Sequence, residues 1–600
     1  MKSTQTLLLL LLLAGWTDVC RAQPPAGSAA VHVPQWAQGA VWYQIFPERF
    51  RNGDPGNDPT ASRTLGRDQG AAWQLSPWTA NWYKLQPWER RHSNDFYAEN
   101  VFNRMYGGDL IGVIEKLDYL ADLGVTALYF TPLFESPSLH KYDASTWHHI
   151  EADFGRNRDA DLELMRHEKK DTTAWAWSSA DSVFLELIKQ AHARGLRVVI
   201  DGAFNHVGRE FWAFQDVIAH QAKSRYANWF SIERWDDPAT PADEMKYDCW
   251  WDVWTLPEFR EDENGLPAGV KAYVWAITRR WMDPNGDGNP DDGVDGWRLD
   301  ATRDVSPAFW REWCAYARRL NPEVYLCAEI WEEAPHWISN DLFNAVMNYP
   351  FAYAIVKFFI NQRRATLSPP QFQAELARLL KLYPAPVNLG LMNLVNTHDT
   401  DRLASMICNP DLDYDRQRSP RSNPNYDPTK PGPEAVKVQK MIVALQATHP
   451  GAPLIFYGDE AGMWGADDPD CRKPMLWPEF TYEPETYETI GRQAPPAVVQ
   501  FNHDLHRHYR TLLRLRAQHP ALRFGAWQPL LAEEKRALWG FARSMAGDTV
   551  LAYFNLGQQQ QAIALPAAAF AWQDVLQNEI TASGSLLLPA KTAAVLVPRK

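Results

Sequence analysis

Eight short apolar runs recur along the chain, and this repetition limits the fold more than any other feature of the sequence. The runs cover residues 41–46, 125–130, 196–200, 293–299, 324–328, 343–347, 391–395 and 453–457, and helical patterns separate most of them. Continuous apolar runs of this length predict strands that are buried on both faces, as in a parallel sheet. Eight such strands alternating with helices predict a (β/α)8 TIM barrel, whose functional loops follow the carboxyl ends of the strands.

The segment before the second run shows how each unit is built. Asp109 opens an amphipathic stretch with apolar residues at three-residue steps, and Gly124 ends it directly before the run 125–130. A polar cap at the start and a glycine at the end are usual limits of a helix. A helix over 182–194 precedes the third run in the same way, and a helix over 307–320 precedes the fifth.

Two regions depart from this rhythm and predict further domains. An irregular, tryptophan-rich interval follows the third run, and short strand patterns with Gly and polar turns begin near residue 524. The predicted fold class is α/β: a barrel with a small domain inserted after the third strand and a C-terminal all-β sandwich domain. The predicted boundaries are 1–22 for a signal peptide, 23–40 for a linker, 41–206 and 269–523 for the barrel, 207–268 for the inserted domain and 524–600 for the β domain.

The first residues predict export to the periplasm or the medium. Lys2 precedes the leucine run 7–13, and Cys20 and Ala22 provide the small residues expected before a cleavage site. The apolar run is far shorter than the roughly 20 residues that span a bilayer, and no later segment is long enough. A lipid anchor on Cys20 is an alternative, but the preceding Asp18-Val19 matches a lipoprotein site poorly.

Charge and cysteine content exclude several partners. The chain has 60 basic and 73 acidic residues, a net charge of −13, which lacks the basic surface that nucleic acids and anionic membranes require. Five cysteines remain after Cys20, and none forms a CxxC pair. This spacing argues against a cysteine zinc site and allows at most two disulfides.

Acidic residues stand where several predicted strands end. Asp201 closes the third run, Asp300 follows the fourth, Glu329 follows the fifth, and His398-Asp399 comes after the seventh. Any one of these carboxylates has the simpler interpretation of a helix cap or a solvated turn. Four on one rim repel each other and lower stability, which favours a functional role.

Asp300 and Glu329 end neighbouring strands, which lie roughly 4.8 Å apart in a sheet. Their carboxyl groups are therefore expected about 5 to 5.5 Å apart, the spacing of a nucleophile and a general acid in a retaining glycosidase. Arg298, two residues before Asp300, is expected to keep that carboxylate ionised. The apolar neighbours of Glu329, which include Trp331, are expected to raise its pKa and suit it to be the acid.

These motifs resemble, in order and spacing, the signature regions of the α-amylase family of glycoside hydrolases, family 13. The matching segments are 201–206 (DGAFNH), 296–300 (GWRLD), 328–331 (AEIW) and 396–399 (NTHD), supported by 124–132 and 451–460. The resemblance extends from about residue 41 to the C-terminus, and six ordered motifs make it highly specific.

The resemblance assigns a role to each matching position. It implies Asp300 as nucleophile, Glu329 as acid and base, and Asp399 as a third acid that holds sugar hydroxyls. Asp201 is expected to be structural and to hold Arg298 or the barrel rim. The substrate-binding residues that it implies are Tyr142 as an aromatic platform, together with His206, Arg298, His398, Asp304 and Trp331.

Three further segments look like the neopullulanase and cyclomaltodextrinase branch: residues 256–259 (LPEF), the EIW of the acid region, and 51–58. Members of that branch commonly carry a starch-binding-like domain before the barrel, where this chain has a short linker. That difference favours a monomer and leaves cyclodextrin preference open. Asp304 stands where the branch usually has Glu, so acceptor preference is open as well.

Two stretches resemble calcium sites, and calcium is the expected cofactor, in a structural role. The first resembles the N-terminal calcium site of that branch and comprises Asn52, Asp54, Asn57, Asp58, Gly107 and Asp109. The second has oxygen-bearing side chains at alternate positions, Asp283, Asn285, Asp287, Asn289 and Asp291, but lacks the distal Glu of an EF-hand. The alternative for both is a solvated turn rich in Asx and Gly.

The expected activity is that of an exported, retaining α-glucan hydrolase that cleaves α-1,4-glucosidic bonds in starch-derived oligosaccharides. The alternatives are a cyclomaltodextrinase or neopullulanase, a glucanotransferase with the same site, and a non-catalytic relative, which the presence of all three acids argues against. Several of the 28 tryptophans are expected to form outer sugar subsites in the loops: Trp73, Trp78, Trp82, Trp88, Trp250, Trp251 and Trp254.

Overall fold

The computed structural model describes residues 30–63, 72–91, 93–168, 175–237, 239–568, 570–577, 579–581 and 584–599. The predicted signal peptide and the first part of the predicted linker lie outside these residues. Among the described helices, none has both the length and the apolar character that a membrane crossing requires.

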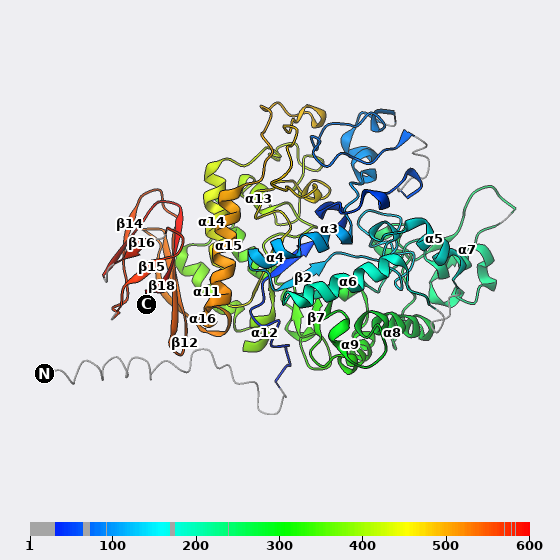
Figure 1. Ribbon diagram of the computed structural model, residues 1–600, viewed down its shortest axis with the longest axis horizontal. Coiled ribbons are helices and arrows are strands. Elements are labelled where there is room, and N and C mark those ends of the chain that lie inside the picture. The colour runs from blue at the N-terminus through cyan, green and yellow to red at the C-terminus, as the bar shows by residue number, and fades with distance from the viewer. Residues whose placement is uncertain are drawn as a thin grey trace.

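Eight parallel strands form a nearly closed barrel at the centre of the molecule (Figure 1). They are β1 (Trp42–Ile45), β2 (Ala127–Phe130), β3 (Arg197–Ala203), β6 (Gly296–Asp300), β7 (Tyr325–Ala328), β8 (Ala345–Val346), β9 (Met392–Asn393) and β10 (Ala452–Phe456). Their order is β8-β7-β6-β3-β2-β1-β10-β9. A single parallel bridge between Met347 and Met392 closes the seam between β8 and β9. The predicted barrel and all eight predicted strands are confirmed.

Helices surround the barrel. Gly124, in the left-handed conformation with φ 101°, ends α4, and Ser178 and Asp181 form a capping box at the start of α6. Their bounds are α2 (Pro47–Phe50), α3 (Leu110–Glu115), α4 (Leu117–Leu123), α5 (Arg158–His167), α6 (Ser179–Ala193), α7 (Trp212–His220), α8 (Ala268–Met282), α9 (Pro307–Leu320), α10 (Tyr349–Ile355), α11 (Pro369–Leu379), α12 (Ala385–Gly390), α13 (Leu403–Cys408), α14 (Pro433–Thr448), α15 (His503–Gln518) and α16 (Pro520–Phe524). The helix expected after Asp109 is divided at Lys116 into α3 and α4.

Antiparallel strands form the C-terminal region beside α14 and α15 (Figure 1). The larger sheet contains β11 (Ala526–Glu533), β12 (Leu538–Met545), β13 (Asp548–Asn555), β18 (Thr592–Pro598), β15 (Trp572–Asp574) and β16 (Glu579–Thr581), and a second pairs β14 (Gln561–Ala564) with β17 (Ser585–Leu588). Side chains alternate along β12, so Leu538 packs with the residues of β14 and β17 while Trp539 contacts Phe358 and Phe372 of the barrel domain. The predicted all-β C-terminal region is confirmed.

The loops after β1 and β2 are much longer than a usual βα connection. The loop after β1 buries Trp73, Trp82 and Trp88, which are at most 6% exposed. The expectation that these rings are outer sugar subsites is therefore wrong, because they pack into small apolar clusters within this loop and, for Trp82, also with Tyr487 of the loop after β10. After β3, the chain forms α7 and a short hairpin of β4 (Ile232–Arg234) and β5 (Lys246–Tyr247) before α8.

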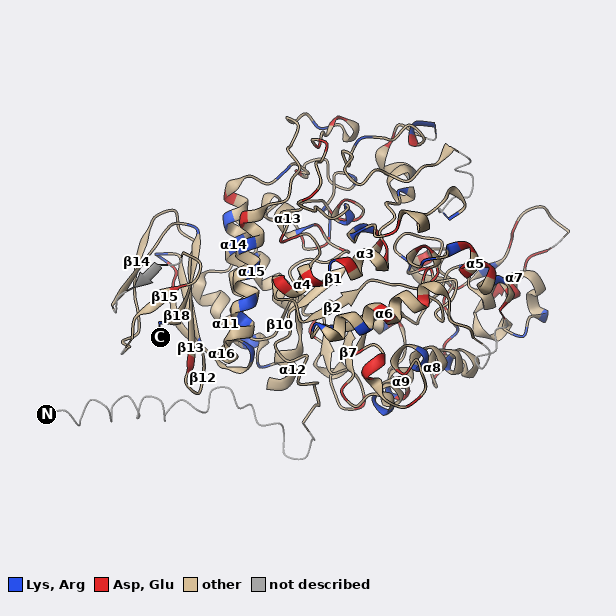
Figure 2. Cartoon of the chain, viewed as in Figure 1, with Lys and Arg blue, Asp and Glu red and all other residues tan. Residues whose placement is uncertain are grey.

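Charged residues are mixed over the helices around the barrel (Figure 2). Basic and acidic residues occur together on several elements, α6 and α9 among them.

Candidate active site

The predicted catalytic acids meet at one rim of the barrel. Asp300 is the last residue of β6, and Glu329 directly follows β7, where its backbone N–H donates to Leu299 O over 3.0 Å. Asp201 lies in β3, two residues before the end of that strand. Asp399 comes from the loop after β9. Parallel strands bring these positions together because their carboxyl ends share one edge of the sheet.

Arg298 is the centre of the acid cluster. This fully buried side chain places Nη1 2.9 Å from Asp201 and 2.7 Å from Asp300, and Nη2 2.8 Å from Glu329. The hydroxyl of Tyr129 also donates to Asp201, over 2.7 Å. Asp201 thus holds Arg298, as expected, and a single guanidinium bridges the two carboxylates predicted to be nucleophile and acid.

Burial has the largest effect on the pKa values of these acids. It raises the pKa of Asp300 to about 6, although Arg298 acts in the opposite direction. Burial likewise raises the pKa of Glu329 to about 7, opposed by Arg298 and increased by the charge of Asp300. The expected low pKa of Asp300 is not found, because burial of the carboxyl group outweighs the opposing effect of Arg298 and the charge of Asp201 raises the pKa further.

Tyr142 and His398 form a wall beside the acids, and the Tyr142 hydroxyl donates to Asp201 over 3.1 Å. The Tyr142 hydroxyl lies 2.6 Å from His398 Nε2, and the two rings stack at 5.7 Å. Gln44 Nε2 lies 2.8 Å from His398 Nδ1, which orients the imidazole. His398 Nε2 is also 3.3 Å from Asp399, whose pKa burial raises to about 7. The sequence-predicted residues of this wall are therefore in mutual contact.

His206 lies between the acids and the inserted region. Its Nδ1 is hydrogen-bonded to Asn205 Oδ1, and its buried Nε2 has no hydrogen-bond partner among the described residues. The ring stacks on Trp250 at 5.0 Å, and Trp250 Nε1 donates to Asp304 Oδ2 over 2.9 Å. The predicted residues His206 and Asp304 are thus joined through Trp250.

Trp331 contacts the predicted acid directly. Its Nε1–H donates to Glu329 Oε1 over 3.1 Å, and its ring stacks on Tyr349 at 4.1 Å. Tyr349 covers one face of the ring, and the hydrogen bond makes Trp331 a residue that positions Glu329. The predicted contact of Trp331 with substrate stays a prediction.

Replacing Trp331 by Phe is expected to raise the pH at which activity declines on the alkaline side. The Trp331 hydrogen bond lowers the pKa of Glu329, so its loss raises that pKa further and keeps the acid protonated to higher pH. The measurement is kcat/KM against pH, with Trp275→Phe, a half-buried ring of α8 away from the site, as control. An alkaline limb that stays in place or moves to lower pH would contradict this role.

The sequence reasoning missed one charged pair in the site. Arg472, in the loop after β10, donates to the backbone oxygen of His398 over 2.8 Å and lies 3.4 Å from Asp399 and 3.1 Å from Asp468. The signal for it was an acid and a base four residues apart just after the last apolar run. The same pattern occurs on many exposed turns, so it does not by itself predict a site residue.

The residues of the first predicted calcium site lie close together in the loop after β1. Asn52 Nδ2 donates to Asp58 Oδ1 over 2.6 Å, and the buried Oδ1 atoms of Asn52 and Asn57 have no hydrogen-bond partner among the described residues. Gly107 closes the loop with φ 74°, where a Cβ would stand 2.3 Å from Asp58 Oδ1. These hard oxygens fit a calcium ion.

The remaining acids of the two predicted calcium loops are engaged in hydrogen bonds. Asp109 accepts from the backbone N–H groups of Gly53, Asp54 and Gly112 and caps α3, and Asp54 accepts from Gly56. In the second loop, Asp283, Asn285, Asp287 and Asn289 accept the N–H groups of Gly288, Asp287, Asn289 and Asp291 in turn. This is the pattern of successive Asx turns, so a calcium ion in the second loop stays a prediction.

A parallel barrel with an Arg-bridged pair of carboxylates at the ends of neighbouring strands, walled by aromatic rings and histidines, defines a class of barrel glycosidases. The sequence matches the family described as "Alpha amylase, catalytic domain" over residues 44–173 and 180–525. The chain therefore belongs to the α-amylase family and is a glycoside hydrolase.

Relatives within the family include enzymes with several specificities. The chain is 34% identical to neopullulanase 2 of Thermoactinomyces vulgaris over 550 residues, covering 91% of this chain and 74% of the relative. It is 33% identical to a cyclomaltodextrinase of a Bacillus species, covering 87% and 73%. The ligand-free cyclic α-maltosyl-(1→6)-maltose hydrolase from Arthrobacter globiformis superimposes with a TM-score of 0.68 at 26% identity, covering 94% and 99%.

Proposed function

We propose that the protein is a retaining α-glucan hydrolase that cleaves α-1,4-glucosidic bonds of starch-derived oligosaccharides through a covalent intermediate on Asp300. The observation that carries this proposal is the bridge that Arg298 makes between Asp300 and Glu329, 2.7 and 2.8 Å away. One guanidinium between two carboxyl groups agrees with the short separation of a retaining enzyme.

In this mechanism Asp300 attacks the anomeric carbon while Glu329 donates its proton to the departing glycosidic oxygen. Arg298 stabilises the ionised form of Asp300. Water then attacks the glycosyl-enzyme, and Glu329 accepts its proton. Asp399 binds sugar hydroxyls, Tyr142 provides a ring for the reacting glucose, and the unpartnered Nε2 of His206 is directed to substrate.

Transfer to a sugar acceptor is a second candidate outcome, because an aromatic surface adjoins the site. Trp251 is 79% exposed and stacks on Trp250, which in turn contacts His206 and Asp304. An exposed indole at this position offers a face to which an acceptor glucose can stack in competition with water. The names of the relatives similarly favour cyclodextrins and pullulan as substrates to be compared with starch.

Product analysis tests the proposal. Proton NMR of fresh maltooligosaccharide digests is expected to show the α-anomer first, and initial β-anomer would refute retention. A panel of starch, pullulan, cyclodextrins and maltotriose, with products separated by size, identifies the preferred substrate. Products longer than the substrate would assign transfer as the main reaction.

We also propose that the chain is exported by its N-terminal segment.

We propose in addition that calcium occupies the Asn52–Asp58 loop. Removal of calcium is expected to lower the melting temperature by several degrees, because two buried amide oxygens lose their partner. Calorimetry before and after chelation, with calcium added back, measures the effect. Asp58→Asn tests the site, because loss of a charged ligand is expected to weaken calcium binding while the amide oxygen can still accept from Asn52, and Asp287→Asn in the second loop is the control. Melting that is unchanged after exhaustive chelation would contradict the proposal.

A further inference from the structure

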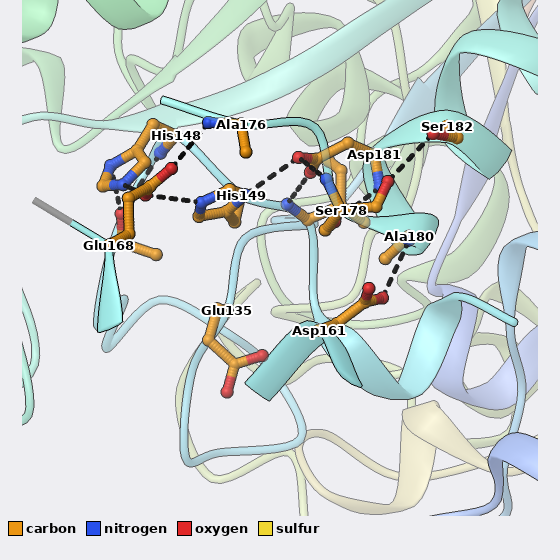
Figure 3. A network of polar contacts seen from close by, with 12 residues as sticks. Glu135, His148, His149, Asp161, Glu168, Ala176, Ser178, Ala180, Asp181 and Ser182 are labelled. Atoms are coloured by element: carbon orange, nitrogen blue, oxygen red, sulfur yellow. Dashed lines mark hydrogen bonds and ion pairs between the residues drawn. The ribbon is translucent and has the colours of Figure 1, made fainter. Parts of the chain in front are cut away.

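Two histidines and a glutamate that the proposed mechanism does not use converge in a buried cluster (Figure 3). His148 and His149 lie in the long loop after β2, and Glu168 directly follows α5. Their side chains are 1%, 1% and 5% exposed. Among the described residues, this is the group of three His, Cys, Asp or Glu side chains whose ligand atoms all lie within 4.8 Å of one another.

The three ligand atoms point at one place. Glu168 Oε2 lies 3.0 Å from His148 Nε2 and 2.9 Å from His149 Nε2. Ligand atoms around a tetrahedral zinc ion stand about 3.4 Å apart, as bonds of about 2.1 Å require. The nitrogen and oxygen ligand atoms would therefore have to move apart by only a few tenths of an ångström for a zinc ion to bind between them.

The outer contacts hold both rings with Nε2 turned inward. His149 Nδ1 lies 2.8 Å from Asp181 Oδ2, which also accepts from the Ser178 backbone and from Arg280. A carboxylate that accepts the Nδ1–H of a histidine is the usual outer partner of a metal-bound imidazole. With Nδ1 protonated, Nε2 of His149 faces Glu168 Oε2 at 2.9 Å through either a second proton on the ring or a metal ion.

The other two ligands are fixed in the same way. His148 Nδ1 lies 2.7 Å from the Tyr273 hydroxyl, and the His148 ring stacks on Trp175 at 4.2 Å and 7°. Glu168 Oε1 accepts the Ala176 N–H over 2.7 Å, which leaves Oε2 for the two histidines. Each ligand is thus oriented before any ion binds.

We propose that His148, His149 and Glu168 bind one divalent transition-metal ion, with zinc preferred to calcium. Two imidazole nitrogens and one carboxylate suit zinc, whereas calcium and magnesium take oxygen ligands. The ion ties the loop after β2 to the end of α5 and, through Asp181, to the start of α6. Because Tyr142 lies in the same loop, the ion also steadies one wall of the active site.

The test uses the full-length protein in constant calcium, so that the calcium loop does not contribute to the result. The protein is stripped of transition metals and titrated with Zn²⁺ against a chromophoric chelator. One equivalent is expected to bind tightly and to raise the melting temperature. Titration with Co²⁺ is expected to give the intense visible absorption of a tetrahedral site with nitrogen ligands.

Variants assign the site. Glu168→Gln and His148→Ala are each expected to weaken zinc binding on the order of 100-fold or more. Changes to the outer partners of metal ligands weaken binding by up to about 100-fold, and the change of a ligand itself is expected to have at least that effect. His167→Ala is the matched control. His167 is the last residue of α5 and directly precedes Glu168, but its side chain is 71% exposed and pairs with Glu163. If a variant does not fold, the Co²⁺ spectrum of the unaltered protein decides. Absence of tight Zn²⁺ or Co²⁺ binding, or equal binding by Glu168→Gln, would overturn the proposal, and the cluster would then be a hydrogen-bonded ion pair of protonated imidazoles.

Discussion

Asp300→Asn is expected to lower kcat on maltooligosaccharides by about 10⁴-fold or more, since the amide cannot form the glycosyl-enzyme. The fold is expected to remain intact, because Arg298 keeps its contacts to Asp201 and Glu329. The change also removes one of the mutually repelling buried carboxylates. Steady-state kinetics and thermal melting measure the two effects.

Azide distinguishes loss of the nucleophile from general damage. With Asp300→Asn, added azide is expected to attack the α-linked substrate directly and give the β-glycosyl azide, the inverted product. Asp341→Asn is the control, because this exposed carboxylate pairs with Arg311 on the helix that follows the same strand. Turnover within tenfold of the unaltered enzyme would rule out Asp300 as the nucleophile.

Glu329→Gln is expected to lower kcat/KM on maltooligosaccharides on the order of 10³-fold, because the departing sugar oxygen is no longer protonated. The loss should be far smaller for the first step with α-maltosyl fluoride, since fluoride leaves without a proton. Hydrolysis of the intermediate lacks its base, so a maltosyl adduct on Asp300 should accumulate. Mass spectrometry of the quenched enzyme detects it.

The stereochemistry of azide rescue separates the two acids. Azide needs no general base, so with Glu329→Gln it should release the intermediate as the α-glycosyl azide, opposite to the product from Asp300→Asn. Glu332→Gln, an exposed residue three positions on that pairs with Arg303, is the control. Equal losses with maltotriose and with α-maltosyl fluoride would show that Glu329 is not the acid.

The strands of the barrel were predictable because each is a continuous apolar run, as expected for a strand that is buried on both faces. The acids were predictable for a related reason: their positions at the ends of strands place them on one rim whatever the loops do. Asp201 shows where this prediction is inexact: it was expected to end its strand, but β3 continues two residues beyond it. Strand ends depend on pairing with a neighbour, which the local sequence does not contain.

The long loops were not predictable to the same degree. Trp82 and Trp88 have no helical or strand periodicity around them, so the sequence did not distinguish a buried ring from a sugar platform. Arg472 reaches the site only because the loop after β10 folds over His398. The pKa of Asp300 likewise depends on its burial and on the nearby charges of Arg298 and Asp201, which are properties of the assembled rim. The His148 cluster depends on Glu168, twenty residues further along.

Because β1 pairs with β10, the first barrel strand remains without one of its two partners during most of the synthesis of the chain. Trp42 pairs with Leu454, and the Tyr43 hydroxyl donates to Glu460 over 2.8 Å, so the earliest strand waits for one more than 400 residues later. At about 5 to 20 residues per second, a ribosome needs roughly 20 to 80 s to supply that partner. During this interval β1 has an unpaired edge, which is a site for wrong association. A nascent chain of this protein is therefore expected to depend on chaperones until its last barrel strand has emerged.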